Sequence, residues 1–114
     1  MARKLKASVA QLGPIHFADT RGAVVKRLMA MMREAHAAGA RFVVFPELAL
    51  TTFFPRYWMT DQREIDRFFE REMPGPETHP LFDLAVELGV GFYLGYAELT
   101  QERGAPRPHL DLGR

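Results

Sequence analysis

One acidic residue, Glu47, stands where a carboxylate could carry out chemistry. It follows residues 41–45 (Arg-Phe-Val-Val-Phe), a short run rich in β-branched and aromatic side chains that predicts a strand buried on both faces. In open α/β sheets, ligands bind beyond the carboxyl ends of the strands. A charge at such a strand end is costly unless it has a partner or a task. From position alone, a catalytic carboxylate and a helix-capping or salt-bridged loop carboxylate are about equally favoured.

The elements that must position Glu47 are a strand, a helix and a second strand. Residues 5–12 partly alternate between apolar and polar side chains, which favours a first strand. Asp19 or Thr20 can cap the following helix, and Gly39 is suited to end it in a left-handed conformation. With residues 41–45, these segments predict a βαβ unit with a right-handed crossover.

Two more helices are expected further along the chain. Asp61 can cap a helix that includes Phe68 and Phe69, and a third helix is expected between Thr78, as its cap, and Gly89. Together with the strand that follows, these elements predict an α/β fold.

The third strand is expected at residues 90–99, where Gly91 and Gly95 indicate a local bend or the close approach of a neighbouring element. Residues 101–114 hold two prolines and two glycines without a sustained period, so we expect a disordered tail. The predicted organisation is therefore a domain over residues 1–100 and a divergent tail over residues 101–114.

The composition excludes several classes of protein. Among the 114 residues, 15 basic and 14 acidic side chains are scattered, which disfavours binding to nucleic acid. There is neither an apolar run of about 20 residues nor a signal peptide, so we expect a cytoplasmic protein without a membrane partner. The absence of cysteine excludes disulfides and a thiol nucleophile within these residues, and the four histidines lack metal-site spacing.

The segment around Glu47 resembles a known family. Residues 41–48 (Arg-Phe-Val-Val-Phe-Pro-Glu-Leu) resemble the strand that carries the catalytic glutamate of the nitrilase, or carbon–nitrogen hydrolase, superfamily. Residues 49–56 (Ala-Leu-Thr-Thr-Phe-Phe-Pro-Arg), 72–76 (Glu-Met-Pro-Gly-Pro) and 91–99 (Gly-Phe-Tyr-Leu-Gly-Tyr-Ala-Glu-Leu) resemble its N-carbamoyl-D-amino acid amidohydrolase branch. The resemblance extends from about residue 5 to residue 99.

The resemblance implies a Glu-Lys-Cys triad that hydrolyses an N-carbamoyl-D-amino acid to the D-amino acid, carbon dioxide and ammonia, without a metal or organic cofactor. Glu47 would be the general base. Lys4, Lys6 and Lys26 are the only lysines and all precede Glu47, whereas relatives carry the lysine and cysteine further along the chain. We therefore expect an amidohydrolase fragment that is inactive alone. The alternative is a non-enzymatic α/β module or a split half that needs a partner chain.

The implied fold is part of an αββα sandwich, with one layer of about three strands and helices on one face. The uncovered face predicts self-association or a partner half. Phe53 and Phe54 are candidates for binding the small-molecule amide, although packing against the sheet is the more common role for such residues. Glu98, the second carboxylate at this edge of the sheet, is a weaker candidate than Glu47.

Overall fold

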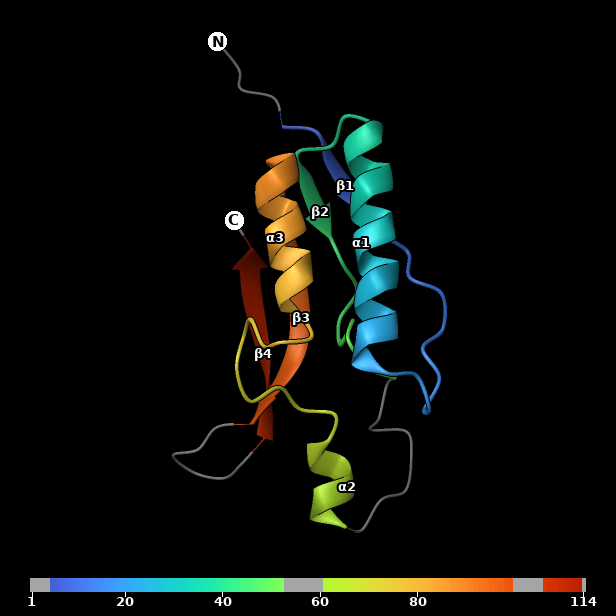
Figure 1. Ribbon diagram of the computed structural model, residues 1–114, viewed down its shortest axis with the longest axis vertical. Coiled ribbons are helices and arrows are strands. Elements are labelled where there is room, and N and C mark those ends of the chain that lie inside the picture. The colour runs from blue at the N-terminus through green and yellow to red at the C-terminus, as the bar shows by residue number, and fades with distance from the viewer. Residues whose placement is uncertain (1–4, 53–60, 100–105, 114) are drawn as a thin grey trace.

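The computed structural model describes residues 5–52, 61–99 and 106–113. These residues form a single layer of strands with helices packed against it (Figure 1). The elements in chain order are β1 (Ala7–Val9), α1 (Arg21–Ala37), β2 (Phe42–Val44), α2 (Gln62–Asp66), α3 (His79–Leu88), β3 (Gly91–Leu99) and β4 (Pro106–Gly113).

The sheet has the order β1-β2-β3-β4, with the first three strands parallel and β4 antiparallel at the edge. Val44 of β2 pairs with Val9 of β1 on one side and with Tyr93 of β3 on the other. Helices α1 and α3 lie on the same face of this sheet (Figure 1). The predicted α/β layer of parallel strands with helices on one face is thus confirmed, and its carboxyl edge is the one beyond Val44.

The core lies between this face of the sheet and the two long helices. Phe92 of β3 is fully buried, and its ring meets Phe45 at 6.1 Å and Phe82 at 5.1 Å between centroids, both edge to face. Such edge-to-face pairs add to the stabilisation that comes from burying apolar area. Other fully buried side chains include Val24, Val25, Leu28 and Met32 of α1, Leu81 of α3, and Val43 and Leu94 of the sheet.

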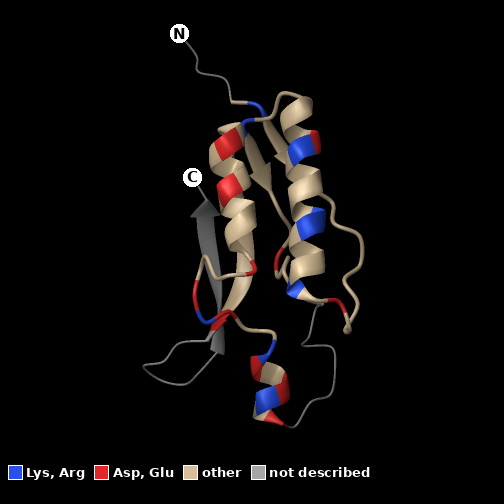
Figure 2. Cartoon of the chain, viewed as in Figure 1, with Lys and Arg blue, Asp and Glu red and all other residues tan. Residues whose placement is uncertain are grey.

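Charged side chains stay away from this core. In Figure 2 the blue and red segments lie on the two long helices, on α2 and in the loops, and strands β1 and β2 carry none. Apolar strands alternating with amphipathic helices are the pattern expected of a parallel sheet. Within the described ranges, no helix is both long and apolar enough to cross a membrane.

Most of the predicted helix ends are confirmed. The Thr20 side chain accepts a hydrogen bond from the Ala23 amide, and the Asp61 side chain caps α2 in the same way. Gly39 and Gly89 both have positive φ, at 90° and 66°. Thr78 precedes α3 but is not a side-chain cap. Its hydroxyl instead forms hydrogen bonds with the Gly75 backbone in the preceding turn.

Two expectations differ from the structure. Helix α2 ends at Asp66, so Phe68 and Phe69 lie beyond it. The helix ends there because the segment that follows pairs with β3: the Glu70 amide donates to the Ala97 carbonyl at 2.6 Å. In the region expected to be a disordered tail, residues 106–113 form β4, because the edge of β3 offers unpaired backbone groups to a neighbouring strand.

Candidate functional site

Glu47 lies on the turn that leaves β2 at the carboxyl edge of the sheet. Backbone hydrogen bonds hold this turn from both sides: the Ala10 amide donates to the Val44 carbonyl at 2.9 Å, and the Phe45 amide donates to the Tyr93 carbonyl at 3.0 Å. The Glu47 side chain is exposed. A carboxylate on a short turn from a buried strand is presented to solvent from a rigid support.

The turn is tightly seated on β3. The Ala49 amide donates to the Gly95 carbonyl at 3.1 Å, and a Cβ atom at Gly95 would lie only 3.3 Å from the Glu47 Cα. The close approach predicted from the glycines of β3 is therefore found at Gly95. Leu48 has a φ of 49°, a conformation that side chains other than glycine and asparagine rarely adopt. Such strain persists only where the surrounding contacts impose it.

A small hollow of about 150 Å³ adjoins the Glu47 turn. The loop after β1 supplies Leu12, Gly13 and Ile15 to its lining, and the segment after β2 supplies residues 46–49, Thr51 and Thr52. A second hollow of about 510 Å³ shares Thr51 and Thr52 with the first. Ligand sites usually occupy about 300–1,000 Å³, so the hollow that Glu47 lines is by itself smaller than a usual ligand site.

The Glu47 carboxylate faces solvent. Within the described part of the chain, no side chain or amide forms a hydrogen bond or an ion pair with it. A solvent-facing carboxylate can accept a proton from a nearby thiol or water molecule. A catalytic role for Glu47 stays a prediction.

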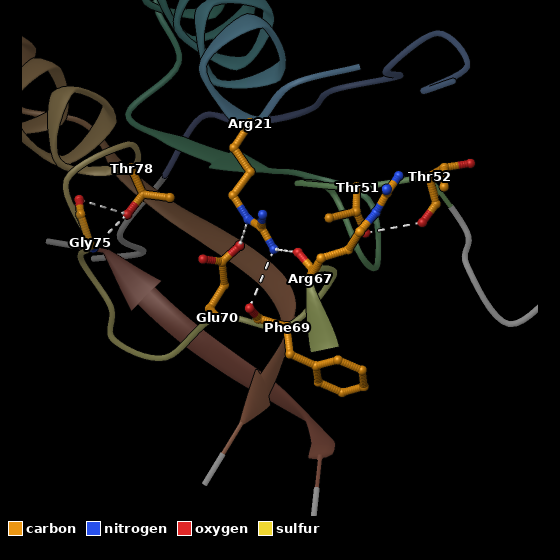
Figure 3. A network of polar contacts seen from close by, with 8 residues as sticks. All are labelled: Arg21, Thr51, Thr52, Arg67, Phe69, Glu70, Gly75 and Thr78. Carbon is orange, nitrogen blue, oxygen red and sulfur yellow. Dashed lines mark hydrogen bonds and ion pairs between the residues drawn. The ribbon is translucent and has the colours of Figure 1, made fainter. Parts of the chain in front are cut away.

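Arg21, which also lines the second hollow, forms a largely buried ion pair with Glu70 (Figure 3). Arg21, the first residue of α1, places its Nε 2.5 Å from the Oε1 of Glu70, which is 8% exposed. Burial raises the pKa of Glu70, the hydrogen bond and charge of Arg21 oppose that rise, and the Glu77 carboxylate adds to it. The pair lines a third hollow of about 440 Å³.

The sequence reasoning did not identify Arg21 and Glu70. Two signals could have found them. A cation in the first turn of a helix is unfavourable against the helix dipole, which indicates that Arg21 has a partner elsewhere. Glu70 follows two phenylalanines, where an acidic side chain needs a partner to be buried.

The other predicted candidates are separate from Glu47 or lie outside the described residues. Phe53 and Phe54 fall outside the described residues, so their predicted role in substrate binding stays a prediction. Glu98, in β3, forms a backbone bridge with Glu70 and so belongs to the neighbourhood of the buried pair. Among the described residues, no three His, Asp or Glu side chains come together as a metal site.

Comparison with known proteins places the chain in a family. It matches the model of the carbon-nitrogen hydrolase family over residues 6–108. It is also similar to the crystal structure of an N-terminal amidase with a Gln-Val peptide, with a TM-score of 0.70, 20% identity, and coverage of 95% of this chain and 24% of that one. The structure titled as that of an N-terminal amidase with a Gln-Gly peptide gives a TM-score of 0.65 and 22% identity over the same shares.

The chain thus spans about a quarter of the length of the solved chains that it matches. At these identities, the structural likeness concerns the fold, whereas the family match covers most of the sequence. The chain belongs to the carbon–nitrogen hydrolase family.

Proposed function

We propose that this chain supplies the general base, Glu47, of an amidohydrolase that acts on N-carbamoyl-D-amino acids. The observation that carries the proposal is the Glu47 turn, which presents an exposed carboxylate at the carboxyl edge of a parallel sheet. The strained Leu48 and the contact with Gly95 hold that turn in place. The family match and the resemblance of residues 41–56, 72–76 and 91–99 to the carbamoylase branch support this reaction.

In the proposed reaction, Glu47 takes the proton from a cysteine thiol as the sulfur attacks the carbamoyl carbon. A lysine stabilises the resulting oxyanion. The C–N bond breaks, Glu47 returns the proton to the departing amine, and the D-amino acid leaves. Glu47 then activates water, which hydrolyses the carbamoyl thioester, and the carbamate decomposes to carbon dioxide and ammonia.

The thiol and the lysine must come from outside these 114 residues. The residues contain no cysteine, and Lys4, Lys6 and Lys26 all precede Glu47. The proposed activity therefore belongs to an assembly that includes further chain, located in the cytoplasm, with a small-molecule amide as its partner and neither nucleic acid nor membrane. The 114 residues alone are expected to release no ammonia from N-carbamoyl-D-amino acids.

The test joins these residues to the remainder of an N-carbamoyl-D-amino acid amidohydrolase, in place of the corresponding part of that enzyme. Ammonia release is then measured for the chimera with Glu47 intact, for Glu47→Gln, and for Glu98→Gln as a control at the same edge of the sheet. We expect turnover that is lost in Glu47→Gln and retained in Glu98→Gln. A folded chimera whose turnover is unchanged by Glu47→Gln contradicts the proposal, as does Glu47-dependent turnover by the 114 residues alone.

The substrate class can be tested in the same assay. The similar amidase structures include complexes with Gln-Val and Asn-Glu peptides. Peptides with an amino-terminal Gln or Asn are therefore the comparison substrates. Faster turnover of these peptides than of N-carbamoyl-D-amino acids would contradict the proposed carbamoylase activity and would indicate a side-chain amidase instead.

A second candidate function is a non-enzymatic module or a split half that binds a partner chain. It is favoured by apolar side chains at the start of the sheet that the helices do not cover: Val9 is 78% exposed and Leu5 is 66% exposed. Burying such side chains is favourable and drives association. Light scattering coupled to size exclusion is expected to show self-association of the purified chain. A dispersed monomer with sharp NMR lines would contradict this expectation.

A further inference from the structure

The loop between β1 and α1 forms part of the hollow next to Glu47. Leu12, Gly13 and Ile15 line this hollow together with Glu47. Within the loop, the His16 amide donates to the Asp19 carboxylate at 2.8 Å, and the Asp19 amide donates to the His16 carbonyl at 3.0 Å. The position of this loop therefore decides the shape of the space that a substrate would occupy beside Glu47.

Arg27 holds the first half of the loop. Its guanidinium, which extends from α1, donates to the Gly13 carbonyl at 2.9 Å and to the Pro14 carbonyl at 3.1 Å. A third contact, at 3.9 Å, joins it to the Asp19 carboxylate. Only a planar, forked group can reach two successive carbonyls in this way, which is why lysine is not equivalent here.

Arg67, which lies 50 residues after Phe17 in the sequence, holds the second half of the loop. It donates to the Phe17 carbonyl at 3.1 Å, and its guanidinium lies 4.3 Å from the Phe17 ring centroid and 4.7 Å from that of Phe68. The two rings are themselves in edge contact at 5.4 Å. A guanidinium against two rings is restricted in its motion and stabilises both. In Figure 3 the Arg67 side chain extends toward Thr51 and Thr52, with which it lines the second hollow.

The buried Arg21–Glu70 pair fastens the segment from which Arg67 extends. Besides Glu70, Arg21 donates to the Arg67 carbonyl and, at 3.3 Å, to the Phe69 carbonyl. The Glu70 amide is bonded in turn to the Ala97 carbonyl of β3. A continuous set of contacts thus leads from β3 through Glu70 and Arg67 to the loop beside Glu47. Figure 3 shows its central part, where Arg21 joins Glu70 to the carbonyls of Arg67 and Phe69.

We propose that Arg27 and Arg67 are positioning residues of the Glu47 site, which hold the loop of residues 12–20 in place, with the Arg21–Glu70 pair as the anchor of Arg67. The relevance to catalysis rests on the proposed role of Glu47. Neither arginine touches the Glu47 carboxylate. They act through the loop, as groups that hold a substrate-facing wall at the correct distance from a catalytic residue.

The test uses the purified chain and three Arg→Lys substitutions that preserve charge. Arg27→Lys and Arg67→Lys remove the forked contacts, and Arg33→Lys, an exposed position of the same helix α1, is the matched control. Amide hydrogen exchange is followed by NMR at His16 and Asp19 in the loop and at Leu28 in the core. The backbone amide signal of Glu47 is recorded as a probe of its surroundings.

We expect loop amides to exchange about tenfold faster in Arg27→Lys and in Arg67→Lys, with the core amide unchanged, because local opening needs only the loop contacts to break. The backbone amide signal of Glu47 is expected to shift in both variants and to stay as in the parent in Arg33→Lys. The proposal is overturned if loop and core exchange accelerate together, if neither changes, or if the Glu47 amide signal is the same in all four proteins. Because no turnover is measured, failure here leaves the role of Glu47 as base untouched, and a failed chimera assay leaves this result standing.

Discussion

A methyl group added at Gly95 tests whether β3 supports the Glu47 turn. In the Gly95→Ala protein, the new Cβ would lie 3.3 Å from the Glu47 Cα, 3.5 Å from the Leu48 nitrogen and 3.8 Å from the Pro46 oxygen. Carbon atoms in optimal contact are about 3.5–4.0 Å apart. The turn must therefore move away from β3 by a few tenths of an ångström.

The expected change in the free energy of unfolding follows from the contacts that this movement disturbs. It lengthens the 3.1 Å hydrogen bond from the Ala49 amide to the Gly95 carbonyl and shifts a backbone that is already strained at Leu48. Overpacking of a close contact by one methyl group costs about 1–3 kcal/mol. Replacing glycine in a strand recovers part of that cost through the lower entropy of the unfolded chain. We expect the free energy of unfolding to fall by about 1–2 kcal/mol.

The assay is urea unfolding followed by circular dichroism, with Gly22→Ala as the control. Gly22 lies in α1, and a Cβ atom there would meet nothing within 4 Å. In the control, the free energy of unfolding should rise by up to about 1 kcal/mol, because alanine favours the helix. The opposite signs of the two Gly→Ala changes separate steric contact from the general effect of losing a glycine.

The reasoning is refuted if Gly95→Ala is as stable as the parent chain and leaves the NMR signals of Glu47 and Leu48 in place. That outcome would mean that β3 does not hold the turn. In the chimeric amidohydrolase, the same substitution should lower turnover while Gly22→Ala does not, because only the former displaces Glu47, the proposed general base.

Three further predictions concern the elements around the site. Leu48→Val should lower the free energy of unfolding by about 1–2 kcal/mol in urea titrations, since a β-branched side chain tolerates a φ of 49° poorly, whereas Leu48→Asn should cost less. Burial raises the folded-state pKa of Glu70 above its unfolded value, so the folded chain binds more protons between the two values. The free energy of unfolding should fall as pH rises through that window, and Glu70→Gln should remove this dependence in unfolding curves taken from acid to neutral pH. Thr20→Ala should lose the cap bond to Ala23 and cost about 1 kcal/mol by thermal or urea unfolding, and an unchanged midpoint would contradict this.

The local pattern of the chain was enough to predict the parallel layer and most helix ends. Residues 42–45 are apolar, although only Val43 and Phe45 among them are fully buried, and capping needs particular side chains at Thr20 and Asp61. Gly39 and Gly89 stand where positive φ is required. These features depend on residues that are neighbours in the sequence, so they can be predicted without knowledge of the tertiary structure.

The segments that were misjudged depend on partners far away in sequence. Phe68 and Phe69 have helical spacing with Ile65, yet they leave α2 because Arg21, about 48 residues earlier, binds the carbonyls around them. Residues 106–113 include two prolines, which weaken the local signal for a strand, and they pair with the edge of β3 in antiparallel register. In both cases a tertiary contact outweighs a weak local preference.

The sequence by itself determined the family, the α/β class and the position of Glu47 at the end of an apolar strand, because strand burial and the residues around the glutamate are local properties of the chain. Only the tertiary structure decided how Glu47 is supported. The contact with Gly95, the positive φ of Leu48 and the arginines around residues 12–20 arise when segments that are tens of residues apart are brought together. Those contacts depend on backbone distances and carbonyl positions, which no residue pattern in the sequence records.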